Sequence, residues 1–233
     1  MVGFIIQARM GSTRLPGKSM MALVNDPLIS WSVKRCMRYT HIKEMDAHVW
    51  VATSNLPKDN ILCEYLHKEF PTLNIFRGSE HDVLSRYKQI CSSHNYTYIF
   101  RVTGDCPLIN YRFIDLCMER VKCSNPDIIN YCNKHFYADK GLEMVRSDAI
   151  LRLCKRNDLT SSDKEHVTRG IYSRPEQFKC EFLNGNCKIS QNEWDFSIDN
   201  NDDLIKMNSL LSEYGGTADQ IETDMFYKFT RER

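Results

Sequence analysis

The sequence has no excess of either charge and no long hydrophobic run. Its 233 residues carry 31 basic and 30 acidic side chains, a formal net charge of +1. It therefore lacks the general attraction for nucleic acid or membrane surfaces that a strongly basic chain has. No apolar stretch is long enough to cross a membrane, and no secretory leader is recognisable. We expect a cytoplasmic protein with neither nucleic acid nor membrane as a partner.

The ten cysteines lack any CxxC pair and any Cys/His spacing typical of a zinc site. A disulfide framework needs an oxidising compartment, for which the sequence has no signal. We expect reduced thiols, with zinc binding and disulfides as the less favoured alternatives. Internal repeats and low-complexity tracts are also missing.

Two well-known phosphate-binding motifs are absent. The dinucleotide fingerprint GxGxxG does not occur. A P-loop needs four residues between its first glycine and GKS, but five separate Gly11 from Gly17, and one of them, Pro16, has no N–H to donate. The chain is therefore neither an ordinary P-loop kinase nor a nicotinamide dehydrogenase.

What the chain does have is the opening stretch IIQARMGSTRLPGK, residues 5–18. An apolar strand delivers a loop whose glycines allow close backbone approach. Arg9, Arg14 and Lys18 add three positive charges beside exposed backbone N–H groups, which suits a nucleoside triphosphate. The plainer alternative is a strand-to-helix turn with scattered surface cations.

Strand-like and helix-like segments alternate after this loop. The pattern predicts a mostly parallel sheet with helices on both faces. Ligands of such sheets bind beyond the carboxyl ends of the strands, where we expect the loops at Arg9, Arg77 and Asp105 to meet. The expected helices are 27–39, 57–70, 81–92 and 111–123, and the expected strands are 2–6, 48–52, 73–76, 97–102 and 127–130.

The alternation weakens over residues 131–182, where charged helices are expected at 147–156 and 161–173. We interpret this region as an inserted subregion of a single domain, residues 1–233. It either covers the sheet as a cap or pairs with a second subunit. A helix from 201 to 214 and a last helical stretch up to 229 are expected to follow.

Two aspartates stand where strands are expected to end. Asp105 follows the strand TYIFRV, and Asp199 follows an apolar stretch and precedes a helix. Two carboxylates facing a triphosphate can share one Mg²⁺, which prefers oxygen ligands. An alternative role for Asp199 is to cap the helix that follows.

The segment FRGSEHDVLSR puts a basic glycine turn, Arg77 and Gly78, at another expected strand end. These two residues are candidates for the nucleotide site. Asp82 and Arg86 have the spacing of an ion pair on a helix surface, which is their commonest role.

Six blocks, in this order, resemble one known family: IIQARMGSTRLPGK, FRGSEHDVLSRY, RVTGDCPLI, KGLEMVRSDAI, KEHVTRGIYSRPEQF and FSIDNNDDL. They are similar to the cytidylyltransferases of the spore coat polysaccharide type, which are related to CMP-acylneuraminate and CMP-ulosonate synthetases. The resemblance covers almost the whole chain. It implies a Rossmann-like, GT-A-like α/β nucleotidyltransferase fold, CTP as substrate, Mg²⁺ as cofactor and a homodimer formed through residues 131–182.

The same resemblance implies roles for individual residues. Lys18, Arg14 and Asp105 are the expected catalytic residues, and Asp105 and Asp199 the expected metal ligands. His166 and Arg169 are expected to reach the acceptor, although a single helical histidine is more often structural. The expected nucleotide-binding residues are Gln7, Ala8, Arg9, Gly11, Ser12, Arg77, Gly78 and Thr103.

Two departures from the family pattern concern the metal and acceptor sites. The block at Asp199 reads IDNNDDL, where the family more often has Thr-Pro after the aspartate. The opening loop is of the QARMGSTRLPGK kind and not the PARGGSKR kind of acylneuraminate synthetases, so the sequence leaves the acceptor open.

The expected reaction is transfer of CMP from CTP to an acidic sugar or related acceptor, with release of pyrophosphate, in surface polysaccharide biosynthesis. Catalysis of such a transfer depends on holding the reacting groups in position and on neutralising the negative charge of the phosphates. A glycosyltransferase that uses a nucleotide sugar is the alternative enzyme. A non-catalytic nucleotide-binding protein of the same pathway is the alternative without activity.

Overall fold

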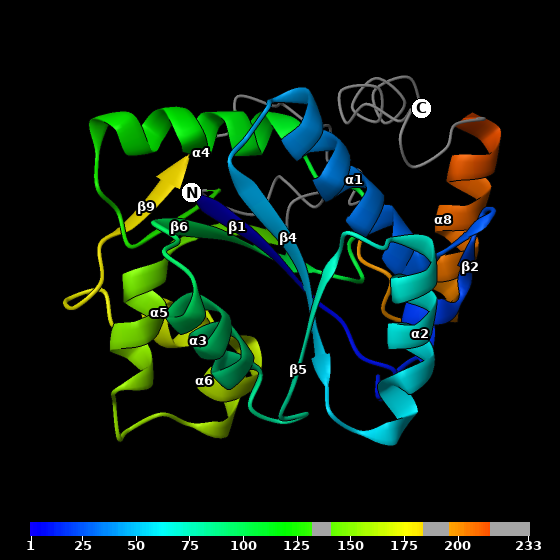
Figure 1. The fold of residues 1–233 in the computed structure, drawn as a ribbon, viewed down its shortest axis with the longest axis horizontal. Helices are drawn as coiled ribbons and strands as arrows, with labels where there is room; N and C mark the ends of the chain where they lie inside the picture. Colours follow the sequence, from blue (N-terminus) through cyan, green and yellow to red (C-terminus); the bar gives the residue numbers. More distant parts are fainter. Residues whose placement is uncertain (132–140, 184–195, 215–233) are drawn as a thin grey trace.

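A computed structural model of the chain describes residues 1–131, 141–183 and 196–214. In these ranges the strands are β1 (Val2–Gln7), β2 (Ala22–Leu23), β3 (Asp26–Pro27), β4 (Ala47–Ser54), β5 (Asn74–Gly78), β6 (Tyr98–Thr103), β7 (Ile128–Tyr131), β8 (Leu142–Arg146) and β9 (Cys180–Leu183). Seven of them form one sheet in the order β5-β4-β1-β6-β8-β7-β9. Strands β5, β4, β1 and β6 of this sheet are labelled in Figure 1. Strands β5, β4, β1 and β6 are parallel, whereas β8 runs antiparallel to both of its neighbours.

Helices cover both faces of this sheet (Figure 1). They are α1 (Leu28–Ile42), α2 (Asn60–Glu69), α3 (Val83–Ser93), α4 (Tyr111–Cys123), α5 (Ser147–Cys154), α6 (Ser161–His166), α7 (Arg169–Tyr172) and α8 (Asn201–Tyr214), with 3₁₀ turns η1 (Lys18–Met20) and η2 (Pro57–Asp59). Buried side chains of α1, α2 and α4 pack on one face, and those of α3, α5 and α7 on the other. The α/β fold expected from the alternation is thus confirmed.

The central strands are mostly apolar because both of their faces are buried. In β1, Phe4 and Ile6 join the core under α1, while Ile5 joins the core under α3. The ring of Phe4 stacks on Phe100 of β6 with 4.8 Å between centroids. These contacts fix β1 and β6 side by side, so the loops that follow the two strands start from neighbouring positions.

The observed elements differ from the expected ones at two places that bear on the site. Pro27 pairs with Ala22 in the small β2–β3 sheet and precedes α1, so it is not a residue of the helix. Arg77 and Gly78 lie within β5, paired with Thr53 and Ser54 of β4, and not in a turn beyond it. The strand continues because β4 still offers backbone partners there.

The described part of region 131–182 is built into the sheet. Strand β8 lies between β6 and β7, and β9 pairs with β7. Leu142 and Met144 enter one core and Val145 the other, so β8 is buried on both faces. An antiparallel strand inside the sheet, and not only a cap above it, therefore accounts for the weaker alternation. The helical stretch expected up to residue 229 lies outside the described residues.

None of the helices in the described ranges combines the length and the apolar character that crossing a membrane requires.

We expect Phe100→Ala to destabilise the protein by about 3–5 kcal/mol, because it removes a fully buried ring and leaves a cavity against Phe4. Urea denaturation followed by circular dichroism measures this loss. The matched control is Ile61→Ala, since Ile61 is 54% exposed and its truncation should cost less than about 0.5 kcal/mol. Equal losses in the two variants would contradict the assignment of Phe100 to the core.

Candidate active site

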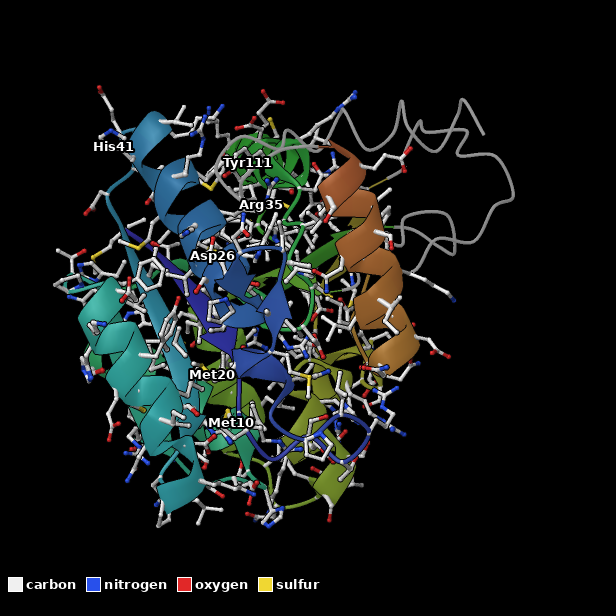
Figure 2. All side chains as sticks on the ribbon, turned by 90° about the vertical axis from the view of Figure 1, so that its right-hand side faces the viewer. Met10, Met20, Asp26, Arg35, His41 and Tyr111 are labelled. Atoms are coloured by element: carbon white, nitrogen blue, oxygen red, sulfur yellow. The ribbon has the colours of Figure 1, made fainter. Side chains whose placement is uncertain are left out.

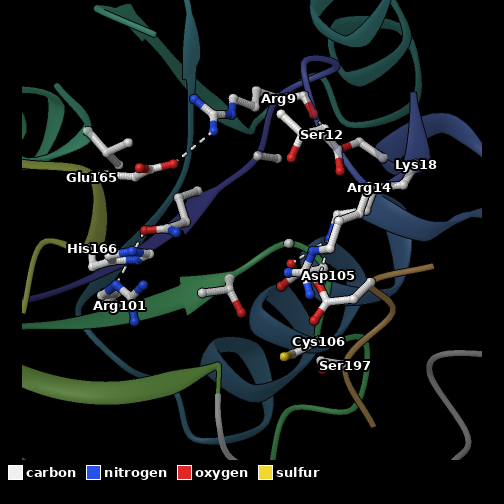
Figure 3. Close-up of a pocket in the computed structure, with 18 of the residues that line it drawn as sticks. Arg9, Ser12, Arg14, Lys18, Arg101, Asp105, Cys106, Glu165, His166 and Ser197 are labelled. Atoms are coloured by element: carbon white, nitrogen blue, oxygen red, sulfur yellow. Dashed lines mark hydrogen bonds and ion pairs between the residues drawn. The ribbon is translucent and has the colours of Figure 1, made fainter. Parts of the chain in front are cut away.

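A cavity of about 360 Å³ lies beyond the carboxyl ends of β1 and β6 (Figure 3). Its lining residues come from the ends of β1 and β6, the opening loop (residues 8–18), the loop after β6, α3, the end of α6 and the segment before α8. This is the sheet edge at which the sequence predicts a ligand site. The predicted nucleotide-binding residues that line it are Gln7, Ala8, Arg9, Ser12 and Thr103.

Buried polar contacts hold the opening loop in shape. The backbone N–H of Met10 donates to the carboxylate of Asp59 at 2.6 Å, and Asp59, fully buried, also accepts from the Ser54 hydroxyl. The N–H of Gly17 donates to the carbonyl of Met10 at 2.9 Å and closes the loop. Gly17 has φ +75°, in the left-handed region that favours glycine. The cations carried by this loop are therefore held on a fixed backbone.

The loop after β6 is fixed to α1. The buried guanidinium of Arg35 donates to the carbonyl of Ile109 from Nε at 3.2 Å and from Nη2 at 2.6 Å. It also lies over the ring of Tyr111, 4.7 Å from the ring centroid. Both residues are labelled in Figure 2. The hydroxyl of Ser32 donates to the carbonyl of Cys106 at 3.3 Å. Because this loop carries Asp105, these contacts fix the place of its carboxylate.

Lys18 joins the two predicted metal ligands. Its Nζ lies 2.7 Å from Oδ2 of Asp105 and 3.2 Å from Oδ1 of Asp199, and it donates to the carbonyl of Ile198 at 2.8 Å. Arg14 donates to the same Asp199 oxygen at 2.7 Å. The backbone joins the two acidic segments as well, since the Ile198 N–H donates to the carbonyl of Asp105 at 2.9 Å. Two carboxylates distant in sequence thus meet at one ammonium group.

The charges of this cluster cancel. Lys18 and Arg14 supply two positive charges, and Asp105 and Asp199 two negative ones. Burial acts to raise the pKa of the Asp105 carboxyl, but the adjacent Lys18 ammonium outweighs it and lowers the pKa below its ordinary value. Asp105 is therefore charged at neutral pH and able to bind a cation.

Asp199 does not cap the helix that follows it. The side chain of Asn200 accepts from the N–H of Asp203 at 3.0 Å, and the Asp203 carboxylate accepts from the N–H of Asn200 at 3.0 Å. This reciprocal pair is a capping box one residue further along. The Asp199 carboxylate instead contacts Arg14 and Lys18. The alternative that Asp199 caps α8 is therefore wrong.

The opposite side of the cavity carries Arg9, Glu165, His166 and Arg101 (Figure 3). Arg9 donates to the carbonyl of Glu80 at 2.8 Å, and its Nη2 lies 3.2 Å from the Glu165 carboxylate of α6. This pair joins the opening loop to α6 across the cavity. Side chains from the amino-terminal half and from region 131–182 therefore share one site.

The family model described as cytidylyltransferase matches residues 3–218. The chain belongs to the cytidylyltransferase family. The resemblance of the six motifs is thereby confirmed.

Individual relatives agree with this assignment. The spore coat polysaccharide biosynthesis protein SpsF of Bacillus subtilis is 27% identical over 98% of this chain and 93% of that protein. The 3-deoxy-manno-octulosonate cytidylyltransferase of Fusobacterium nucleatum is 30% identical over 66% of this chain and 59% of that protein. A solved cytidylyltransferase from Leptospira borgpetersenii superposes with a TM-score of 0.83 at 25% identity, covering 99% of this chain and 92% of that one.

Four predicted site residues do not line the cavity. Arg77 is exposed and donates to the carbonyls of Ser54 and Leu56 at 3.0 and 2.9 Å. These bonds hold Arg77 and its neighbour Gly78 on the outermost strand, β5, away from the cavity lining. The others are Gly11, whose α-carbon faces the Lys58–Glu80 ion pair, and Arg169, which donates to the hydroxyl of Ser162 at 2.6 Å.

Arg86 lines the cavity although the sequence suggested a surface ion pair with Asp82. Asp82 instead caps α3 by accepting from the N–H of Ser85 at 2.9 Å. Arg86 is 1% exposed and donates to the carbonyls of Ala52, Ser79 and Glu80. The predicted pair does not form, because both side chains have backbone partners.

Arg101 also lines the cavity and was missed. The available signal was a charge inside the apolar strand TYIFRV, where a buried guanidinium needs a partner on another element. That partner is Glu143 of β8, 2.7 Å away. The strand β8 was itself not recognised from the sequence, so the pair was not predictable.

We expect Lys18→Met to lower the free energy of unfolding by about 2 kcal/mol at pH 7.5, because it leaves two neighbouring carboxylates without their shared cation. The lowered pKa of Asp105 means that the wild-type protein loses this stabilisation only as the pH falls below about 3.8, the ordinary value. In the variant the Asp105 carboxylate takes up a proton more readily, because burial acts on its pKa without the opposing Lys18 charge. The difference between the two proteins should therefore shrink as the pH is lowered from 7.5 towards 4.

Urea denaturation over this pH range measures the difference. The control is Lys34→Met, which breaks the ion pair of Lys34 with Asp26 on the outer side of α1 and should cost less than about 1 kcal/mol. A difference that stays constant with pH would show that Lys18 does not compensate the carboxylates.

Proposed function

We propose that this protein transfers CMP from CTP to an acidic sugar, releasing pyrophosphate, in the synthesis of a surface polysaccharide. The observation that carries the proposal is the meeting of Lys18 with Asp105 and Asp199 in a cavity at the carboxyl ends of β1 and β6. Family membership supports the use of CTP, and the relatives from Bacillus subtilis and Fusobacterium nucleatum support the polysaccharide pathway and the acidic sugar.

The reaction is an in-line displacement. A hydroxyl oxygen of the acceptor attacks the α-phosphorus and forms the new P–O bond, while the bond from this phosphorus to the bridging oxygen breaks and its electron pair leaves with pyrophosphate. The hydroxyl proton passes to solvent. Lys18 and Arg14 donate to the departing phosphate oxygens, and Arg9 helps to orient the triphosphate.

The charge balance of the site favours a divalent cation. Because Lys18 and Arg14 are neutralised by Asp105 and Asp199, the cluster by itself adds no net positive charge for a polyanionic substrate. Two carboxylates are the usual protein share of a Mg²⁺ site, with water and substrate phosphates as the remaining ligands. The donor set thus fits the ion, and Asp105 and Asp199 would hold it. Bound there, Mg²⁺ would neutralise phosphate charge and acidify the acceptor hydroxyl.

Homodimerisation through region 131–182 and a cytoplasmic location stay predictions of the sequence. The sequence also leaves a glycosyltransferase or a non-catalytic protein as alternatives. The products separate them, since a glycosyltransferase releases a nucleoside diphosphate or monophosphate and a binding protein releases nothing.

We expect the wild-type protein, given CTP, Mg²⁺ and a panel of acidic sugars, to release pyrophosphate with at least one acceptor. Asp105→Asn and Asp199→Asn should each lower the rate at least 100-fold, because an amide cannot replace a carboxylate charge at the cation. The control Asp26→Asn changes an acid that pairs with Lys34 and should keep the wild-type rate. Pyrophosphate is measured by a coupled phosphate assay with each of the four nucleoside triphosphates.

Removal of divalent cations tests the metal separately. With EDTA, pyrophosphate release should stop and return on addition of Mg²⁺. The melting temperature should rise on addition of CTP with Mg²⁺ by more than the sum of the rises with either alone, since the substrate phosphates complete the coordination. Full activity in EDTA would remove the metal from the proposal.

A further inference from the structure

A buried carboxylate outside the proposed metal site is fully engaged by four donors. Glu143 of β8 is 4% exposed. Its Oε2 accepts from Nη1 of Arg101 at 2.7 Å and from the hydroxyl of Thr168 at 2.8 Å. Its Oε1 accepts from the hydroxyl of Tyr172 at 2.7 Å and from the amide of Asn130 at 3.1 Å. Glu143 therefore joins β6, β7, β8 and the α6–α7 region at one point.

This network holds Arg101 in one orientation. Besides the ion pair with Glu143, Nε of Arg101 donates to Oε1 of Gln7 at 3.3 Å, and the Tyr87 hydroxyl donates to the same oxygen at 3.2 Å. Burial acts to lower the pKa of Arg101, but the Glu143 charge outweighs it and the pKa is raised. A planar guanidinium fixed on two of its edges is pre-organised to bind with the third.

The third edge of Arg101 carries Nη2. Among the residues that the structure describes, none accepts a hydrogen bond from its Nη2. Arg101 lines the cavity together with His166, on the side away from Lys18 and Asp105 (Figure 3). This edge is the natural place for a planar anionic group of a ligand.

The backbone beside His166 is strained. Val167 is fully buried and has φ 54° and ψ −70°, a γ-turn in which the N–H of Thr168 donates to the carbonyl of His166 at 2.6 Å. Positive φ is unfavourable for a β-branched residue and persists only where the surroundings impose it. The turn sends His166 to the cavity and the Thr168 hydroxyl to Glu143, so the carboxylate that holds Arg101 also anchors the segment that carries His166.

In-line geometry places the acceptor on this side. The attacking oxygen and the departing pyrophosphate lie on opposite sides of the α-phosphorus. Since Lys18 and Arg14 take the pyrophosphate, the acceptor must approach from the side of Arg101 and His166. We propose that Arg101 binds the carboxylate of the acceptor and sets the preference for an acid, and that Glu143 is the positioning residue that fixes Arg101. This inference rests on the proposed function and deepens it.

The test measures binding in a complex that cannot react. Isothermal titration is done with α,β-methylene-CTP and Mg²⁺ present, using 3-deoxy-manno-octulosonate and N-acetylneuraminate as probes, each compared with its methyl ester. The wild-type protein should bind at least one acid at least tenfold more tightly than the ester, because the ester lacks the charge that Arg101 recognises. Binding of neither acid, or equal binding of acid and ester, overturns the proposal.

Variants of Arg101 test whether this residue causes the preference for the acid over the ester. Arg101→Met should reduce the difference between acid and ester to less than threefold while the affinity for α,β-methylene-CTP stays within twofold. Arg101→Lys, which keeps the charge without the planar fork, should give an intermediate preference and serves if the Met variant does not fold. Arg146→Met is the control, because Arg146 lies on β8 outside the cavity and should keep the full preference.

Glu143→Gln tests whether Glu143 positions the Arg101 guanidinium or only offsets its charge. If Glu143 fixes Arg101, the Gln variant loses the preference for the acid, although one negative charge has been removed from the site. A preference equal to or greater than that of the wild-type protein would show that Glu143 only offsets charge, and would overturn its positioning role. Absence of pyrophosphate release with every acceptor, while acid binding still depends on Arg101, would refute the proposed function and leave the subsite in place.

Discussion

The need to compensate two neighbouring carboxylates organises the site. Nζ of Lys18 contacts Asp105, 87 residues away in the sequence, and Asp199, 181 residues away. Because the three groups are largely withdrawn from water, their interaction is less screened than that of surface pairs. This contact forms only when three segments are in place: the opening loop, the loop after β6 and the segment before α8. The position of the Lys18 ammonium group therefore depends on the whole fold.

The cavity has two differently built sides. On one side Lys18 and Arg14 of the opening loop form ion pairs with Asp105 and Asp199. In the proposed reaction the triphosphate would pair with these cations and a metal ion with these acids. On the other side Arg101 is held by Glu143, a buried carboxylate that accepts hydrogen bonds from four donors. The first arrangement suits groups that exchange partners during a reaction, and the second suits recognition by a fixed donor.

Several parts of this site were predictable because their signals are local. An apolar strand followed by a loop rich in glycine and basic residues predicted the phosphate side, and the two aspartates at expected strand ends predicted its acids. Arg77 and Gly78 were misplaced because a strand end depends on how far its neighbour continues, here Ser54 of β4. Arg101 was missed because its partner lies on β8, whose antiparallel place in the sheet no local pattern of the chain reveals.

By itself the sequence determined the α/β alternation, the family through six ordered blocks, and most of the basic and acidic residues that meet in the cavity. Apolar periodicity and glycine-rich turns act over a few residues, so they can be recognised without knowing the fold. Only the tertiary structure decided that Asn200 and not Asp199 caps α8, that Lys18 lies between the acids, and that Glu143 holds Arg101. These depend on strand order and on burial, which bring together charges that must be paired once water is excluded.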